Sequence, residues 1–333
     1  MLTASTLLLC YRAILTTASI IFAAADVSAA SQQDLEICQD SADVPIMIKA
    51  CTNLAQDARL PPGARSMALL KRGFGNFALG NIDAAEVDFS DAIRLNPKNQ
   101  YAHHELGLTL VRKGEMNRAI ASFGEAIKID PSSAASRFSR GRAYTSEGNL
   151  DEAIEDFTAA IKLGADKNTA FAKDQVVDRP EAKRIAADYY GARADAYYLR
   201  GSFKDAVSDY DRAAGLSDPT GYMRIWGSVA RTQGGSGDAD SALSAVLGKG
   251  DLKDWSKSVG ELLIGRITPA AALAAAKDAG QICEAHYYGG IAQLKAKDLV
   301  LAQKEFATAR DGCPSAFREH AAAVADLKRL QAK

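Results

Sequence analysis

Few residues in this chain have the type and spacing that catalysis or metal binding requires. The sequence holds four histidines, and the tightest group of candidate ligands is His103-His104-Glu105. Neighbouring residues on a helix point about 100° apart, so this run is poorly placed to hold one ion. We expect one of these histidines to pack between helices and the other to line a groove. The sequence predicts no metal ion and no cofactor.

Two further runs contain residue types that ligand-binding loops use. Gly234-Gly235-Ser236-Gly237 lacks the lysine and the spacing of a phosphate-binding loop. Asp238-Ala239-Asp240 lacks the glycine and the distant glutamate of a calcium loop. We interpret the first run as a connection between helices and the second as the start of a helix. Because no nucleophile with acid–base partners can be assigned, the sequence predicts that the protein is not an enzyme.

The overall charge limits the kinds of partner. The formal net charge is −1, and the 40 basic and 41 acidic residues form no block of one sign. A nucleic-acid-binding surface normally shows a basic stripe or patch, so we expect no nucleic acid partner.

Residues 1–30 have the features of an export signal. Arg12 precedes an apolar stretch from Ala13 to Ala25, and small residues follow it. This stretch is shorter than the roughly 20 apolar residues that a spanning helix needs. We predict a signal peptide that is cleaved after Ala29 or Ala30, which places the protein in the periplasm or outside the cell without a membrane span. The alternative is an uncleaved membrane anchor.

The cysteine count is informative once this leader is set aside. Cys10 would be removed with the leader, and four cysteines would remain in two well-separated couples. An even number in an exported chain predicts disulfides, and four cysteines allow three pairings. The four are Cys38, Cys51, Cys283 and Cys313.

The elements that carry these residues are visible as an internal repeat. Three segments align without gaps at a spacing of 34 residues. Small residues let two antiparallel helices cross closely, and a large aromatic ring fills the space beside them. A glycine just past the first helix suits a left-handed helix end, and a proline ends the pair because it cannot continue a helix. The aligned columns are Gly73, Gly107 and Gly141; Gly80, Gly114 and Gly148; Ala85, Ala119 and Ala153; Phe89, Phe123 and Phe157; Ala92, Ala126 and Ala160; Ile93, Ile127 and Ile161; and Pro97 with Pro131.

Over residues 66–165 this pattern resembles the tetratricopeptide-repeat (TPR) family. The resemblance implies an all-α fold, a right-handed superhelical solenoid of antiparallel helix hairpins. Arg72 and Arg140 stand where the family usually has leucine, and we expect them to be snorkelling or ion-paired. The expected domains are a signal peptide (1–30), a degenerate helical hairpin (31–65), three regular units (66–167), a fourth unit with a lengthened first helix (168–218), two degenerate hairpins (219–280), and a final unit with a capping helix (281–333).

The last helix of this solenoid is expected at Ser315–Leu330. An end repeat has no neighbour to cover it, so a capping helix should turn apolar residues inward and charges outward. The residues expected to face inward are Ala321, Val324, Ala325 and Leu327.

The hairpin frame also suggests which cysteines pair. Cys283 opens the first helix of the final unit and Cys313 ends the second, so an antiparallel hairpin brings them together. Cys51 falls where the phenylalanine column would lie in the degenerate first hairpin, and Cys38 lies on the opposing helix. Each disulfide would stabilise a terminal hairpin by about 3 kcal/mol in the loop-entropy model.

The resemblance further implies that the first helix of each unit lines a concave groove. The corresponding side chains form an apolar and aromatic trough with a few basic residues, which suits a partner peptide or amphipathic helix. The alternative is that some of these aromatic residues belong to the core. The expected groove residues are Leu70, Phe74, Phe77, Tyr101, His104, Leu108, Val111, Arg112, Phe138 and Arg142.

The sequence therefore favours a non-catalytic protein–protein interaction adaptor of the bacterial cell envelope. It is similar to the envelope TPR proteins that scaffold other proteins. The alternatives are a structural or oligomerising envelope component and, from the fold alone, an enzyme with a site of its own.

Overall fold

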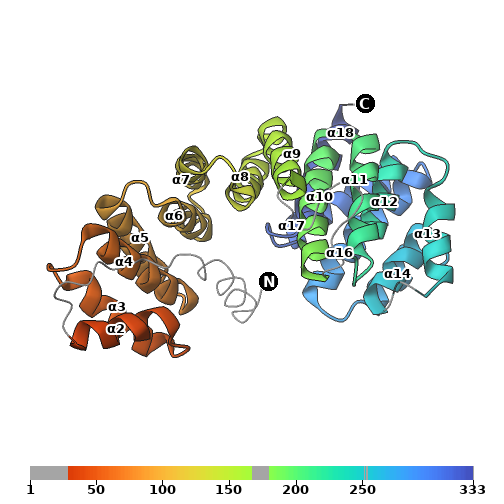
Figure 1. Ribbon diagram of the computed structural model, residues 1–333. Coiled ribbons are helices and arrows are strands. Elements are labelled where there is room, and N and C mark those ends of the chain that lie inside the picture. The colour runs from red at the N-terminus through yellow and green to blue at the C-terminus, as the bar shows by residue number, and fades with distance from the viewer. Residues whose placement is uncertain (1–28, 167–179, 251, 253, 333) are drawn as a thin grey trace. The chain divides into compact units, whose positions relative to one another are not determined.

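The computed structural model describes residues 29–166, 180–250, 252 and 254–332, and this part of the chain consists of helices without strands (Figure 1). The predicted signal peptide lies outside the described residues except for Ala29 and Ala30, and so do residues 168–179 of the predicted fourth unit. No helix among the described residues is both long and apolar enough to cross a membrane. The chain divides into two compact units between Ser139 and Arg140.

The N-terminal unit is built from helix hairpins that stack one on the next. The first and second helices of a hairpin pack side by side, and each hairpin packs on its neighbour through α3 with α4 and α5 with α6. The helices are α2 (Ala29–Asp40), α3 (Val44–Gln56), α4 (Pro62–Ala78), α5 (Ile82–Leu95), α6 (Gln100–Lys113), α7 (Met116–Ile129) and the first part of α8 (Ala134–Glu147).

The C-terminal unit begins with the rest of α8 and contains hairpins of unequal length. Its longest helix, α10, has 21 residues, whereas α15 has seven. The helices are α9 (Leu150–Asp166), α10 (Pro180–Arg200), α11 (Phe203–Leu216), α12 (Tyr222–Gln233), α13 (Ala239–Gly248), α14 (Asp254–Leu263), α15 (Pro269–Ala275), α16 (Ala279–Lys295), α17 (Leu299–Gly312) and α18 (Arg318–Gln331).

The repeated glycine and phenylalanine columns contact each other directly. A Cβ atom at Gly107 would lie 2.5 Å from the Phe123 ring, and one at Gly290 would lie 2.6 Å from the Phe306 ring. Real Cβ contacts are never this short, so the ring occupies the space that any larger residue would fill. In these hairpins, glycine and phenylalanine are therefore needed together, sixteen residues apart, for the two helices to pack closely.

The arginines that depart from the family pattern are ion-paired, as expected. Arg140 Nε and Nη2 donate to the two carboxylate oxygens of Asp156 at 2.7 and 2.9 Å. The same sixteen-residue pair recurs as Arg72 with Asp88 and as Arg193 with Asp209, and all three aspartates are buried. Each pair joins the two helices of one hairpin.

Both predicted disulfides are present. Cys38 is bonded to Cys51, which joins α2 to α3, and Cys283 is bonded to Cys313, which joins the start of α16 to the end of α17. One disulfide thus lies in the first described hairpin and the other in the last.

The C-terminal helix differs from the expected capping helix. Leu327 is buried, but Ala321, Val324 and Ala325 are only half-buried. The buried positions of α18 include two carboxylates, Glu319 and Asp326, so the prediction that its charges face outward was wrong. The physical reason is that tyrosine hydroxyl groups of neighbouring helices lie opposite these carboxylates.

Candidate protein-binding surface

Most of the residues expected to line a groove in the N-terminal unit lie on α4 and α6, with different exposures. Tyr101 is 43% exposed and Arg112 is exposed, while Leu108 and Val111 are half-buried. Leu70 is only 1% exposed and belongs to the core. Its assignment to a partner surface was therefore wrong, because α4 turns that residue toward its neighbours in the hairpin stack.

The two phenylalanines of α4, Phe74 and Phe77, are both half-buried and lie between the core and the surface. Phe74 is half-buried and packs edge-on against the core ring of Phe89, with 5.5 Å between the ring centroids. The guanidinium of Arg112 lies 5.3 Å from the centroid of the Phe77 ring. This cation–π contact links α6 to α4 and places a positive charge beside an aromatic surface.

His104 couples the second and third regular hairpins. Its Nδ1 lies 3.0 Å from the Ser136 hydroxyl, and its ring lies 5.4 Å from that of Phe123. Burial lowers the pKa of His104 from 6.5 to about 4, so the ring is neutral at pH 7. His104 therefore brings no positive charge to the candidate surface. Its neighbour His103 contacts the carbonyl of Pro97 at 3.0 Å.

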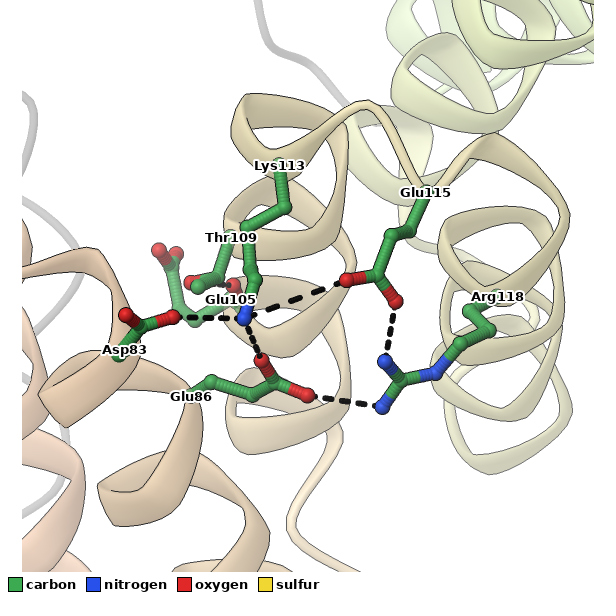
Figure 2. A network of polar contacts seen from close by, with 7 residues as sticks. All are labelled: Asp83, Glu86, Glu105, Thr109, Lys113, Glu115 and Arg118. Atoms are coloured by element: carbon green, nitrogen blue, oxygen red, sulfur yellow. Dashed lines mark hydrogen bonds and ion pairs between the residues drawn. The ribbon is translucent and has the colours of Figure 1, made fainter.

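A charged network fixes α6 against the helices on either side of it (Figure 2). Lys113 Nζ donates to Asp83 and Glu86 of α5 at 2.7 Å each. Arg118 of α7 donates to Glu86 at 2.8 Å and also to Glu115. The hydrogen bonds from Lys113 and Arg118 hold the pKa of the Glu86 carboxyl below its ordinary value. Exposed pairs contribute little one by one, but this network spans three helices and sets how they stack.

The remaining two predicted groove residues fall on either side of the division between the units. Phe138 is half-buried in the N-terminal unit, and Arg142 is exposed in the C-terminal unit. Burial raises the pKa of Asp188 on α10, and the positive charges of Arg184 and Arg142 reduce this rise.

The interior of the C-terminal unit contains an aromatic cluster that the sequence analysis missed. Tyr198, Trp226, Tyr287 and Tyr288 are fully buried, and they come from α10, α12 and α16. The rings of Trp226 and Tyr287 are stacked, with centroids 5.3 Å apart. Adjacent tyrosines in α10 and α16 were the available signal, but they do not show which hydroxyl groups are buried.

The buried hydroxyl groups of this cluster are satisfied by carboxylates of α18. Tyr198 donates to Asp326 at 2.8 Å and Tyr287 donates to the same oxygen at 3.2 Å. Tyr288 donates to Glu319 at 2.8 Å. Burial raises the pKa of both carboxyl groups above their ordinary values.

No three side chains of the His, Cys, Asp or Glu type gather to hold a metal ion in the described part of the chain. What the geometry offers is a set of aromatic, apolar and basic side chains on α4 and α6, on a scaffold of stacked hairpins. This arrangement can contact another protein through its side-chain surface.

A family model and solved structures resemble this chain. A tetratricopeptide-repeat family model matches residues 76–134 and 104–168. A tetratricopeptide repeat protein from Parabacteroides merdae is 12% identical, with a TM-score of 0.53 over 91% of this chain and 100% of that chain. A crystal structure of MamA is 21% identical, with a TM-score of 0.47 over 55% of this chain and 91% of that chain. No curated protein matches the chain in sequence.

Stacked hairpins with glycine and phenylalanine in register define a class, the helical-repeat proteins that serve as scaffolds for protein–protein contacts. Within that class, residues 76–168 match the tetratricopeptide-repeat family model, and the fold resembles that of a solved tetratricopeptide repeat protein. Members of this family are generally non-catalytic interaction modules, and they bind protein partners.

Proposed function

We propose that this protein is an adaptor of the bacterial cell envelope that binds a partner protein on α4 and α6 of its N-terminal unit. The observation that carries the proposal is the arrangement on α6, where Tyr101, Leu108, Val111 and Arg112 recur at helical spacing without being absorbed into the core. A large aromatic residue, half-buried apolar residues and an arginine are the side chains that dominate protein-binding surfaces.

The chemistry of this surface favours an amphipathic helix or an extended peptide with acidic residues. Half-buried Leu108 and Val111 would receive apolar side chains of the partner. Arg112, already placed over the Phe77 ring, would meet a carboxylate. His104 is neutral and Lys113 is paired with Asp83 and Glu86, so Arg112 is the charge on α6 that would select for acidic partners.

The location in the envelope is part of the proposal. It is supported by the predicted signal peptide and by the two disulfides, since disulfides persist mainly in oxidising compartments. Fractionation of cells, with mass analysis of the mature N-terminus, tests it. A chain that stays in the cytoplasm with free thiols would contradict it.

A structural or oligomerising role is the second candidate. It is favoured by the exposed apolar run Leu299-Val300-Leu301 at the start of α17, in which Val300 is 78% exposed. Exposed apolar residues in a continuous run are typical of contacts between subunits. Sedimentation of the purified protein, with Val300→Asp as the comparison, separates this role from the adaptor role.

The adaptor role is tested by photo-crosslinking in cells from position 101, with position 87 on α5 as the matched control. Val87 is 59% exposed but lies on a second helix of a hairpin, outside the proposed surface. We expect a discrete protein adduct from position 101, none from position 87, and loss of the adduct when Leu108→Asp or Arg112→Glu is added. Equal adducts from both positions would contradict a binding surface on α6.

A further inference from the structure

The inner face of the C-terminal unit is occupied by the chain's own last helix. This inner face is formed by side chains of α10, α12 and α16, and α18 packs against both α10 and α16 although α10 lies more than 100 residues earlier. The residues that form the inner face are Asp195, Tyr198, Trp226, Tyr287 and Tyr288.

Charged side chains hold α18 at both of its ends. At the first turn, Arg318 Nε lies 2.8 Å from Asp195 Oδ1, and its guanidinium lies 5.5 Å from the Trp226 ring. At the last turn, Arg329 Nη2 donates to the backbone carbonyls of Tyr198 and Leu199 at 2.5 and 2.7 Å. These contacts are directional, and they define a register for the bound helix.

Between these ends, two carboxylates seven residues apart receive the tyrosine hydroxyl groups. Glu319 and Asp326 lie two helical turns apart and so on the same side of α18. Their hydroxyl partners come from Tyr288 for the first and from Tyr198 and Tyr287 for the second. The inner face is therefore complementary to a helix that carries two carboxylates seven residues apart.

The apolar contribution of α18 is small for a core helix. Its buried apolar residues are Ala322, Ala323 and Leu327. By contrast, α16 buries two tyrosines and an isoleucine in the same cluster. The contacts of α18 with the inner face are therefore largely polar, and a partner helix that carries the same polar groups can make them too.

The fit of α18 also leaves polar atoms without partners. Trp226 Nε1, beneath Arg318, and Nδ1 of His320 on α18 are buried and have no hydrogen-bond partner in the described structure. Buried donors are almost always paired in proteins, so the unpaired Trp226 Nε1 beneath Arg318 marks an imperfect match at that contact. A helix that offered an acceptor to Trp226 Nε1 would match the inner face better.

The connection to α18 is suited to release. Five residues, from Cys313 to Phe317, separate the end of α17 from the start of α18. Cys313 is held to α16 by its disulfide, so α17 stays attached to α16 when the segment beyond it moves.

We propose that the inner face of the C-terminal unit is a helix-docking surface that α18 occupies within the chain, and that a partner helix with two carboxylates seven residues apart replaces α18 there. In the closed state this surface is blocked, and in the open state it presents three tyrosine hydroxyl groups and a tryptophan to the partner. The surface is separate from the one proposed on α4 and α6, so either proposal can fail alone.

The first experiment is hydrogen exchange of the full chain, resolved by peptide. We expect the amides of α18 to exchange at least about tenfold faster than those of α16 and α17, because α18 opens locally while its neighbours stay folded. Equal protection in α16, α17 and α18 would show that α18 is part of the cooperative core and would overturn the proposal.

The second experiment uses a labelled peptide of residues 315–332 as the probe in trans. We expect it to bind the Arg318→Ala/Arg329→Ala variant at least about tenfold more tightly than it binds the unchanged chain, whose own helix competes. Arg310→Ala is the matched control, since Arg310 pairs with Asp311 on the surface of α17. A peptide with Glu319→Lys and Asp326→Lys should lose binding.

Three outcomes would contradict the proposal. The variant could fold normally and not bind the peptide, it could bind both peptides equally, or it could lose the helicity of the whole C-terminal unit. The last result would mean that α18 builds the fold and is not a displaceable occupant.

Discussion

The two units use the same helix hairpin but fill its inner side differently. In the N-terminal unit, first-helix residues such as Tyr101 and Leu108 stay at least partly exposed. In the C-terminal unit, the corresponding helices bury tyrosines and a tryptophan and are covered by α18. The comparison indicates that a repeat scaffold offers a binding surface only where no other part of the chain already covers the inner side.

A consequence of burying tyrosine is the need for acceptors. The phenylalanine column of the N-terminal unit packs without polar partners, whereas Tyr210 in the same column donates to Asp195 at 2.6 Å. Asp195 occupies the repeat position that Leu108 holds in the N-terminal unit. These two repeat positions therefore carry a polar pair, Tyr210 and Asp195, in the C-terminal unit. In the N-terminal unit they carry the apolar pair Phe123 and Leu108.

The largest expected effect comes from removing a buried core ring, and the two units should differ in which helices then lose hydrogen-exchange protection. Phe123→Ala and Trp226→Ala should each cost about 3–5 kcal/mol, because both remove a fully buried ring. In the N-terminal unit we expect lost hydrogen-exchange protection only in neighbouring helices, since stacked hairpins contact their neighbours. Trp226→Ala should affect α10, α12, α16 and α18 together. Losses confined to α11–α13 would contradict a single C-terminal core.

The buried arginine–aspartate pair gives the next largest effect. Arg72→Ala should destabilise the N-terminal unit by about 3 kcal/mol, since it leaves the Asp88 carboxylate buried without its main partner. The hairpin of α6 and α7 has Leu106 and Ser122 at the repeat positions of Arg72 and Asp88. The double variant Arg72→Leu/Asp88→Ser should therefore recover most of the stability in urea unfolding. If the double variant is as unstable as Arg72→Ala, the pair has a role beyond charge compensation.

The units should also respond to pH with opposite signs. The folded-state pKa of His104 is lowered, so its contribution to stability is complete above pH 6.5 and is lost as the pH falls toward 4. We expect a loss of about 3 kcal/mol in the N-terminal unit over that range, removed by His104→Leu.

In the C-terminal unit, burial raises the pKa values of Glu319 and Asp326. Their contribution is complete below the unfolded pKa and is lost as the pH rises through the raised folded values. Protection of α18 should therefore increase as the pH falls, while that of α6 decreases. Region-resolved hydrogen exchange between pH 4.5 and 7, corrected for intrinsic rates, checks both signs, and a parallel response of α6 and α18 would contradict the assignment.

The smallest expected effect concerns Tyr210, which stands at the phenylalanine position of its hairpin. Tyr210→Phe should cost about 1 kcal/mol, because it removes one hydrogen bond while Arg318 still pairs with Asp195. Phe123→Tyr should cost more, since Leu108 stands where Asp195 would accept the hydroxyl hydrogen. Urea midpoints of the two variants make the comparison, and equal costs would show that the acceptor is unimportant.

The sequence by itself determined the repeat, the helix hairpins and the two disulfide pairings. These features depend on contacts at fixed short separations, such as Gly107 with Phe123 and Cys283 with Cys313, so spacing along the chain is enough to predict them. The ion pairing of Arg72 and Arg140 is of the same kind, because each partner lies sixteen residues away in the same hairpin.

Only the tertiary structure decided where α18 lies and which residues stay available for a partner. The contacts of Asp326 with Tyr198 and of Arg318 with Asp195 join positions more than 100 residues apart, and the local pattern of α18 suggested that its charges face water. The burial of Leu70 was likewise set by the neighbouring helices. Exposure and long-range polar contacts depend on how hairpins of unequal length stack, and no short-range spacing encodes that arrangement.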